Sequence, residues 1–335
     1  MAPSRDQELR RKRRKRLVRG LLMGGAAIGV PALLNALVTK RAGRLPAAVW
    51  GRGDTFKWKH GEVTYQRLGA GRPLLLLHSF GPGHSSEEWR QASELLAGSH
   101  EVFVPDLLGW GRSDKPSLTY DSELYFDLIR DFTQQVVAQR VDGDPPVAVA
   151  AGLPAAYAAQ LAVDQPELWR ALALIVPSGI ELQSDEPDFK DAIVHWLLRL
   201  PVLGTSALNL YTSRSALTSY LRREVYAMPS RVDDALVDLH YRRSHQPGAH
   251  AALAAYLSGY LNHSVRETLS SVDIPVWLGW GRQAAAPAVE SADLWLRQLA
   301  GAELDILEHC GILPHVEEPK EFVERLEKFL HGLDS

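Results

Sequence analysis

Serine, histidine and glutamate side chains that could support acyl transfer stand close together in "HSFGPGHSSEEW", residues 78–89. A serine nucleophile needs a base to take its proton and a third group to orient that base. The stretch offers Ser79, Ser85, Ser86, His84, Glu87 and Glu88. Neighbours within one loop rarely reach this geometry. We therefore interpret the stretch first as a polar surface loop and second as a relocated serine site.

A second place for a nucleophile is the turn in "VAVAAGLPAAYAAQLA", residues 147–162. An apolar run that indicates a buried strand meets Gly152 and continues into a helical stretch of small residues. A sharp strand-to-helix turn of this kind can present a nucleophilic side chain. Glycine has no side chain, and Pro154 fits the first helical turn. The sequence thus has the turn that supports a nucleophile but no nucleophile on it.

These stretches belong to a pattern of alternating strands and helices. Two short strands joined at residues 60–61 come first, and helices are predicted over 122–139 and 319–331. Continuous apolar runs, typical of strands buried on both faces, are "RPLLLL", "HEVFVP", "VAVAA", "ALALI", "IPVWLGWG" and "AELDIL". The order predicts one α/β domain over 45–335 with a mostly parallel, doubly wound sheet. Residues 181–268 show only helical patterns, which predicts a cap over the carboxyl ends of the strands.

The charge of the chain is divided unevenly along its length. Of its 335 residues, 37 are Lys or Arg and 40 are Asp or Glu, a net charge of −3. Residues 1–44 hold 12 of the basic and 2 of the acidic residues, so this segment carries +10 and the remainder −13. The acidic body argues against nucleic acid as a partner.

Residues 1–44 form a basic tail with a candidate membrane-anchoring helix over 20–38. These 19 residues carry no charge and would span about 28 Å as a helix, close to the thickness of a hydrocarbon core. We expect membrane lipid to contact this helix, with the side of the membrane left open. A cleaved or export signal and a basic, partly disordered arm with a helix on the body are the alternatives.

The sequence offers no convincing metal or cofactor site. Cys310 is the only cysteine, which excludes an intrachain disulfide and argues against a cysteine-based metal site. His240, His245 and His250 recur every five residues, a spacing that does not stack on one helix face. We therefore predict no metal and no cofactor.

Four strings, in order, resemble the α/β-hydrolase superfamily, specifically its capped members related to epoxide hydrolases and haloalkane dehalogenases. They are "LLLLHSFGPGHSSEEWR", "PDLLGWGRSDKP", "IPVWLGWG" and "CGILPHVEEPKEFVERLEKFL". The resemblance implies an α/β-hydrolase fold with a helical cap inserted before the last strands.

The resemblance also implies where a catalytic triad would stand. The nucleophile would be at Gly152, the acid at Ala284 and the histidine at Ile312, so all three positions are substituted. His315, three residues further, is interpreted as a structural side chain.

The substitutions by Gly, Ala and Ile indicate that the site has become apolar. We therefore predict a membrane-associated pseudo-hydrolase that binds an apolar small molecule or a partner protein of unknown identity. The candidate ligand-binding residues are Ser79, Phe80, Gly152, Leu153 and Ile312. The alternative is an active hydrolase of small lipophilic esters that uses an unconventional nucleophile. A further alternative is a structural subunit whose pocket has collapsed.

Overall fold

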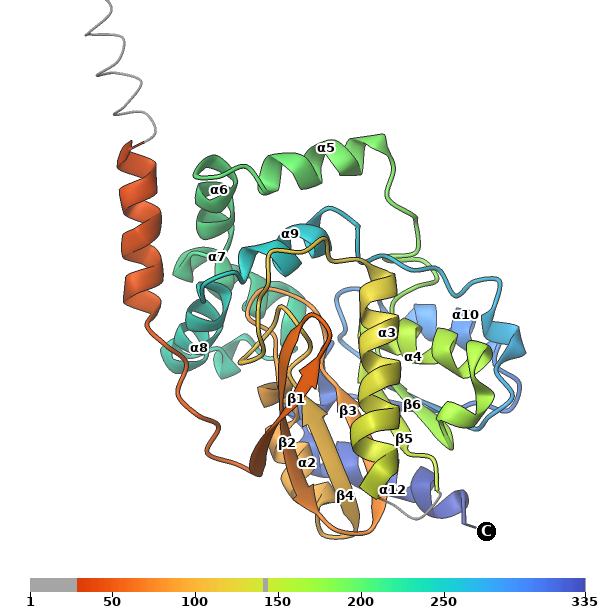
Figure 1. Cartoon of the computed structure of the whole chain (residues 1–335). Coiled ribbons are helices and arrows are strands. Elements are labelled where there is room, and N and C mark those ends of the chain that lie inside the picture. Colours follow the sequence, from red (N-terminus) through yellow and green to blue (C-terminus); the bar gives the residue numbers. More distant parts are fainter. Residues whose placement is uncertain (1–28, 141–143, 335) are drawn as a thin grey trace, which may run out of the picture.

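The computed structural model describes residues 29–140 and 144–334, which contain one eight-stranded sheet flanked by helices (Figure 1). The sheet order is β1-β2-β4-β3-β5-β6-β7-β8. β2 is antiparallel to β1 and β4, and all other neighbours are parallel. The strands are β1 Arg52–Trp58, β2 Gly61–Gly69, β3 Arg72–Leu77, β4 His100–Pro105, β5 Val147–Ala151, β6 Ala171–Ile175, β7 Val276–Gly281 and β8 Glu303–Leu307. The predicted doubly wound, mostly parallel sheet is confirmed.

The apolar runs become central strands because helices cover both faces of the sheet. Every residue of β5, β6 and β7 is buried, as the sequence predicts for strands without a polar face. The helices that follow the sheet strands are α2 Arg90–Leu96, α3 Ser122–Phe132, α4 Leu153–Asp164, α10 Ala292–Leu296, α11 Pro314–Glu317 and α12 Pro319–Gly332. α3 begins where the Asp121 side chain accepts a hydrogen bond from the backbone of Leu124.

The helix predicted over 122–139 differs from the observed one at its end. The α-helix stops at Phe132 and continues as a wider π-helical turn over Thr133–Val137. The Thr133 hydroxyl donates to the carbonyl of Ile129 at 2.7 Å, and that carbonyl also accepts from the Thr133 N–H. A 3-10 turn over Ala138–Arg140 follows, so the chain is helical over the whole predicted range and only the type of helix changes.

A helical cap lies between β6 and β7, above the carboxyl ends of the strands (Figure 1). Its helices are α5 Phe189–Leu198, α6 Leu203–Tyr211, α7 Arg214–Tyr220, α8 Asp234–Ser244 and α9 His250–Leu257. Aspartates start two of them: Asp188 forms a capping box on α5, and Asp233 accepts from the backbone of Leu236 in α8. The predicted insertion of helices before the last strands is present.

Residues 29–42 form a helix that stands beside the cap (Figure 1). The Asn35 amide donates to the carbonyl of Val202 at 3.0 Å and accepts from Ser206 and Asn209 of α6 at 3.2 and 2.9 Å. Residues 20–28 of the predicted membrane-anchoring helix lie outside the described residues. Within residues 29–140 and 144–334, no single helix has the length and apolar composition needed to cross a bilayer.

Candidate functional site

The turn between β5 and α4 keeps the backbone shape that presents a nucleophile. Gly152 at its apex has φ 66° and ψ −131°, in the left-handed region that favours glycine. Its N–H donates to Ile175 at 3.0 Å, and its carbonyl accepts from Ser178 at 3.2 Å, which ties the turn to β6 and the loop behind it. A Cβ added at Gly152 would meet only Ser79, with its nearest atom at 3.4 Å. The apex therefore has room for a side chain that the sequence does not supply.

The other two positions at which a triad member is expected from the sequence follow β7 and β8 at the same edge of the sheet. Ala284 is buried in the loop after β7, where its N–H donates to Gly281 at 3.1 Å. Ile312 follows β8 and is half-buried, and its N–H donates to Val225 of the cap at 3.1 Å. Because β5, β6, β7 and β8 are consecutive parallel neighbours, Gly152, Ala284 and Ile312 all stand at the carboxyl edge of the sheet. None of the three carries an acid, a base or a nucleophile.

His315 lies close to this edge but is held in the core. Its ring stacks on Trp89 with centroids 3.8 Å apart, and its Nε2 lies 3.4 Å from Glu88 Oε1. Burial lowers the pKa of His315 against the opposing effect of Glu88, so the ring is neutral near pH 7. A stacked, fully buried imidazole facing an internal carboxylate is a structural arrangement.

The loop after β3 is buried, and its interpretation as a polar surface loop is wrong. Ser79, His84, Ser85 and Ser86 are each at most 5% exposed. Cap helices cover the loop: His240 Nδ1 of α8 lies 2.8 Å from the carbonyl of Pro82. The sequence does not reveal this cover, because the covering residues follow the loop by more than a hundred positions.

Within this loop, the Ser79–His84–Glu88 cluster brings three of the predicted polar side chains together. Ser79 Oγ lies 2.7 Å from His84 Nδ1 and 3.0 Å from Glu88 Oε2, and His84 Nδ1 lies 3.1 Å from the same Glu88 oxygen. The Ser79 N–H donates to Glu88 Oε1 at 2.8 Å. His84 Nε2 faces the Tyr220 hydroxyl at 2.9 Å. Tyr220 belongs to the cap, and sequence reasoning missed its part in the cluster.

The geometry of the Ser79–His84–Glu88 cluster differs from that of a catalytic triad. In a triad the imidazole faces the nucleophile with one nitrogen and the acid with the other. Here one nitrogen of His84 faces both Ser79 and Glu88, and the other is occupied by Tyr220. Burial alone would raise the pKa of Glu88, but the His315 and His84 imidazoles that face its carboxylate hold it well below its usual range. Glu88 is therefore a buried anion and a poor base at neutral pH.

Phe80 and Leu153, also predicted to bind ligand, are packed into the core. Phe80 is 5% exposed and stacks on Trp110 with centroids 5.1 Å apart, while Leu153 is 2% exposed in the first turn of α4. Gly152 and Ser79 are in contact range of each other, as the added Cβ shows. The predicted ligand residues thus gather at the carboxyl edge of the sheet, beneath the cap.

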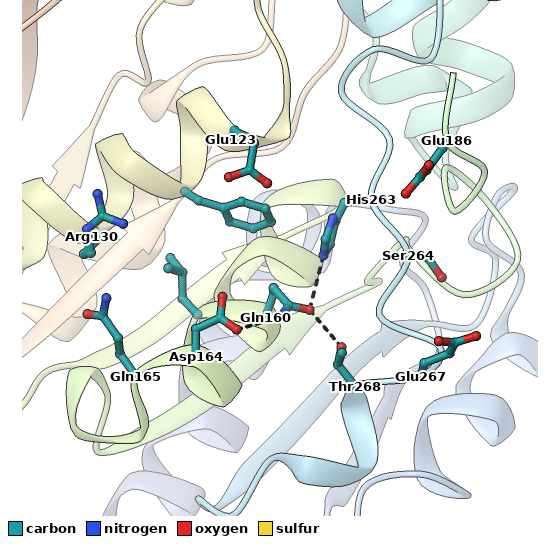
Figure 2. A pocket seen from close by; sticks show the side chains of 12 residues that line it. Glu123, Arg130, Gln160, Asp164, Gln165, Glu186, His263, Ser264, Glu267 and Thr268 are labelled. Atoms are coloured by element: carbon teal, nitrogen blue, oxygen red, sulfur yellow. Dashed lines mark hydrogen bonds between the residues drawn. The ribbon is translucent and has the colours of Figure 1, made fainter. Parts of the chain in front are cut away.

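A cavity of about 540 Å³ lies elsewhere, between α3, α4 and the segment 263–268 (Figure 2). Its α4 residues, such as Gln160 and Asp164, come from the half of the helix far from Gly152. Gln160 Oε1 lies 2.8 Å from the Thr268 hydroxyl and 3.3 Å from His263 Nε2. The lining is polar and acidic, and none of the five predicted ligand residues contributes to it. A smaller cavity, about 70 Å³, lies beside His84 and Glu88 under α8.

The buried histidine of α8 predicts acid-sensitive stability. Burial, with His84 and Arg243 nearby, lowers the pKa of His240 from 6.5 to about 3, against the opposing effect of Glu88. Between these two pH values, His240 is protonated in the unfolded chain and neutral in the folded chain. Stability contributed by this group is complete above pH 6.5 and falls as the pH drops towards 3, by about 3 kcal/mol between pH 7 and 4.

Between pH 7 and 4, we expect the free energy of unfolding to fall less in the His240→Gln variant than in the unsubstituted chain. Urea unfolding of both proteins at pH 7, 5.5 and 4 measures the two slopes. Equal slopes would show that His240 does not titrate as its burial requires.

Comparison with known proteins places this fold in a family. Residues 74–325 match the model of the "Alpha/beta hydrolase family". A 2-hydroxy-6-oxo-6-(2'-aminophenyl)hexa-2,4-dienoic acid hydrolase of Metapseudomonas resinovorans is 25% identical over 80% of this chain and 87% of its own length. The solved structure of a serine hydrolase involved in carbazole degradation aligns with a TM-score of 0.67 at 22% identity, over 84% of this chain and 98% of its own. A membrane phospholipase A aligns with a TM-score of 0.66 at 22% identity, over 96% and 99%. The two structures share the fold, and the family match covers most of the sequence: the chain belongs to the alpha/beta hydrolase family.

Proposed function

We propose that this chain is a membrane-associated α/β-hydrolase-fold protein that does not use a Ser/Asp–His–Asp triad and that binds an apolar small molecule beneath its cap. The observation that carries the proposal is Gly152 at the apex of an intact nucleophile turn. The strained backbone of such a turn is useful to an enzyme because it exposes a reactive side chain. Here the backbone is kept and the reactive group is absent.

The residues at the other two triad positions support the same proposal. Ala284 and Ile312 replace an acid and a base by a methyl and a branched alkyl group. A buried polar group without a partner destabilises a site, whereas alkyl groups favour an apolar guest. We propose that Ser79, Phe80, Gly152, Leu153 and Ile312 contact that guest. Because Phe80 and Leu153 are buried, the guest enters when the cap helices are displaced.

Membrane association is proposed from the basic tail and from a structural relative. The uncharged segment 20–38 follows a basic block over residues 10–19, and its residues 29–38 belong to the helix 29–42. Uncharged apolar segments with basic flanks are typical of membrane anchors. The phospholipase whose fold is shared over 96% of this chain is itself described as a membrane protein.

A second candidate function is ester hydrolysis with Ser79 as the nucleophile. The 2.7 Å separation of Ser79 Oγ and His84 Nδ1 favours it. Against it stand the burial of Ser79 and the shared use of one imidazole nitrogen by Ser79 and Glu88. When that nitrogen carries the proton, His84 donates to Ser79 and accepts nothing from it.

Ester hydrolysis by the purified full chain, measured across acyl lengths, tests the proposal. We expect the unsubstituted chain and Ser79→Ala to give the rate of the buffer blank. Organic extraction of the same preparations and mass spectrometry should then recover an apolar molecule. A rate that Ser79→Ala abolishes would establish the second candidate. Blank rates without any retained molecule, together with capture of a stoichiometric protein, would favour partner binding instead.

A further inference from the structure

Most of the large apolar side chains that are exposed in the described residues lie in one region. Twelve of the sixteen such side chains lie in three helices: the helix 29–42, α5 and α6. Phe189 is 80% exposed, Trp196 62%, Leu210 74% and Leu33 63%. A soluble protein surface rarely carries an apolar patch of this extent without a partner. The outer face of these three helices is here called the cap face.

The three helices are neighbours in the fold. Asn35 of the helix 29–42 bonds to α6 through the carbonyl of Val202 and the side chains of Ser206 and Asn209. α5 leads into α6 through a bend of 93°. In Figure 1 the helix 29–42 stands next to α6, and α5 lies across the end of the molecule farthest from α12. α5 therefore lies on the side of the cap away from the sheet, and the helix 29–42 flanks the cap.

We propose that the cap face docks on an anionic phospholipid bilayer, so that the cap, and with it the edge that holds Gly152, faces the membrane. The proposal deepens the membrane association proposed above and rests on it. Lipid is favoured over a second copy because residues 29–38 of the cap face are the second half of the uncharged apolar segment 20–38, which follows the basic block 10–19 in the sequence. Basic side chains close to an anionic leaflet add attraction, and the exposed Lys190 and Arg199 also flank the face.

The lengths of the helices indicate docking on the surface rather than spanning. α5 has ten residues and is therefore about 15 Å long, half of a hydrocarbon core. Its bend into α6 prevents the two from forming one straight span. Amphipathic helices with aromatic residues at the polar boundary lie in the interface, and Trp196 and Tyr211 provide such residues here.

The tryptophans of the chain provide a direct test. Eight of the nine are at most 8% exposed, and only Trp196 is open to its surroundings. The full chain is reconstituted into vesicles of phosphatidylcholine and phosphatidylglycerol that carry bromine on the acyl chains. Bromine quenches tryptophan on contact, so we expect partial quenching in the unsubstituted chain and its loss in Trp196→Phe. The double variant Phe189→Ser/Leu210→Ser should also lose quenching, whereas Leu95→Ser, a matched change on α2, should keep it.

The outcomes separate the two proposals. A chain that floats with the vesicles but shows no quenching of Trp196 would overturn docking of the cap face and leave membrane association intact. A chain that does not float would remove both. If the chain floats, Trp196 is not quenched by the brominated lipid and the mass of the protein in detergent is twice that of one chain, a second copy and not lipid covers the cap face.

Discussion

Replacing Gly152, Ala284 and Ile312 together by Ser, Asp and His is expected to raise ester hydrolysis at least about 100-fold over the unsubstituted chain. The apex of the turn already has the nucleophile conformation, and an added Cβ meets no atom nearer than 3.4 Å. The three positions follow β5, β7 and β8, in the chain order of nucleophile, acid and histidine. Hydrolysis of short-chain esters, followed by absorbance, measures the gain.

The three substitutions should act only as a unit. Gly152→Ser alone has no base and should stay at the blank rate. Ala284→Asp alone places an unpaired carboxylate in a buried position and should destabilise the fold. The matched control combines Gly152→Ser with Ala284→Asn and Ile312→Gln, which are polar but supply neither acid nor base. A folded triple variant with no more activity than this control would contradict the assignment of the three positions.

Glu88→Ala is expected to lower the free energy of unfolding by about 3 to 5 kcal/mol. The Glu88 carboxylate accepts from the Ser79 N–H at 2.8 Å and contacts His84 and His315 at 3.1 and 3.4 Å. Removing it leaves buried donors without an acceptor. Urea unfolding at pH 7 measures the loss.

The exposed Glu94→Ala in α2 is the matched control, and it should cost at most about 0.5 kcal/mol. The loss from Glu88→Ala should also depend on pH. Because the folded chain holds the pKa of Glu88 below its ordinary value of 4.5, the stabilising effect is complete above pH 4.5 and declines below it. A loss that is small at pH 7, or that grows on acidification, would contradict the role of a buried anion.

The sequence predicts the fold well because the fold depends on local patterns. Apolar runs such as "VAVAA" and "ALALI" have no polar face, and their short length between turn residues favours strands covered on both sides, which the structure has. The absence of such runs over 181–268 correctly predicts the helical cap. The change from α-helix to a π-helical turn at Thr133 does not follow from the apolar stripe, which is compatible with either.

The site was predicted less completely because its environment is made by distant residues. The turn at Gly152 follows from the strand, the glycine and the helix next to it in sequence. The burial of Ser79 and His84 does not, because Tyr220 and His240 of the cap cover them from more than 130 positions away. Polarity of a segment predicts exposure only where no insertion folds back over it.

Covalent labelling with a fluorophosphonate, read by intact mass, tests the absence of triad catalysis most directly. Such reagents form a stable covalent bond with an activated serine and do not react with an unactivated one. The triple variant at Gly152, Ala284 and Ile312 is the positive control. We predict that the unsubstituted chain gains no mass under conditions that label this variant. A single adduct on the unsubstituted chain, absent from Ser79→Ala, would contradict the account and identify Ser79 as a working nucleophile.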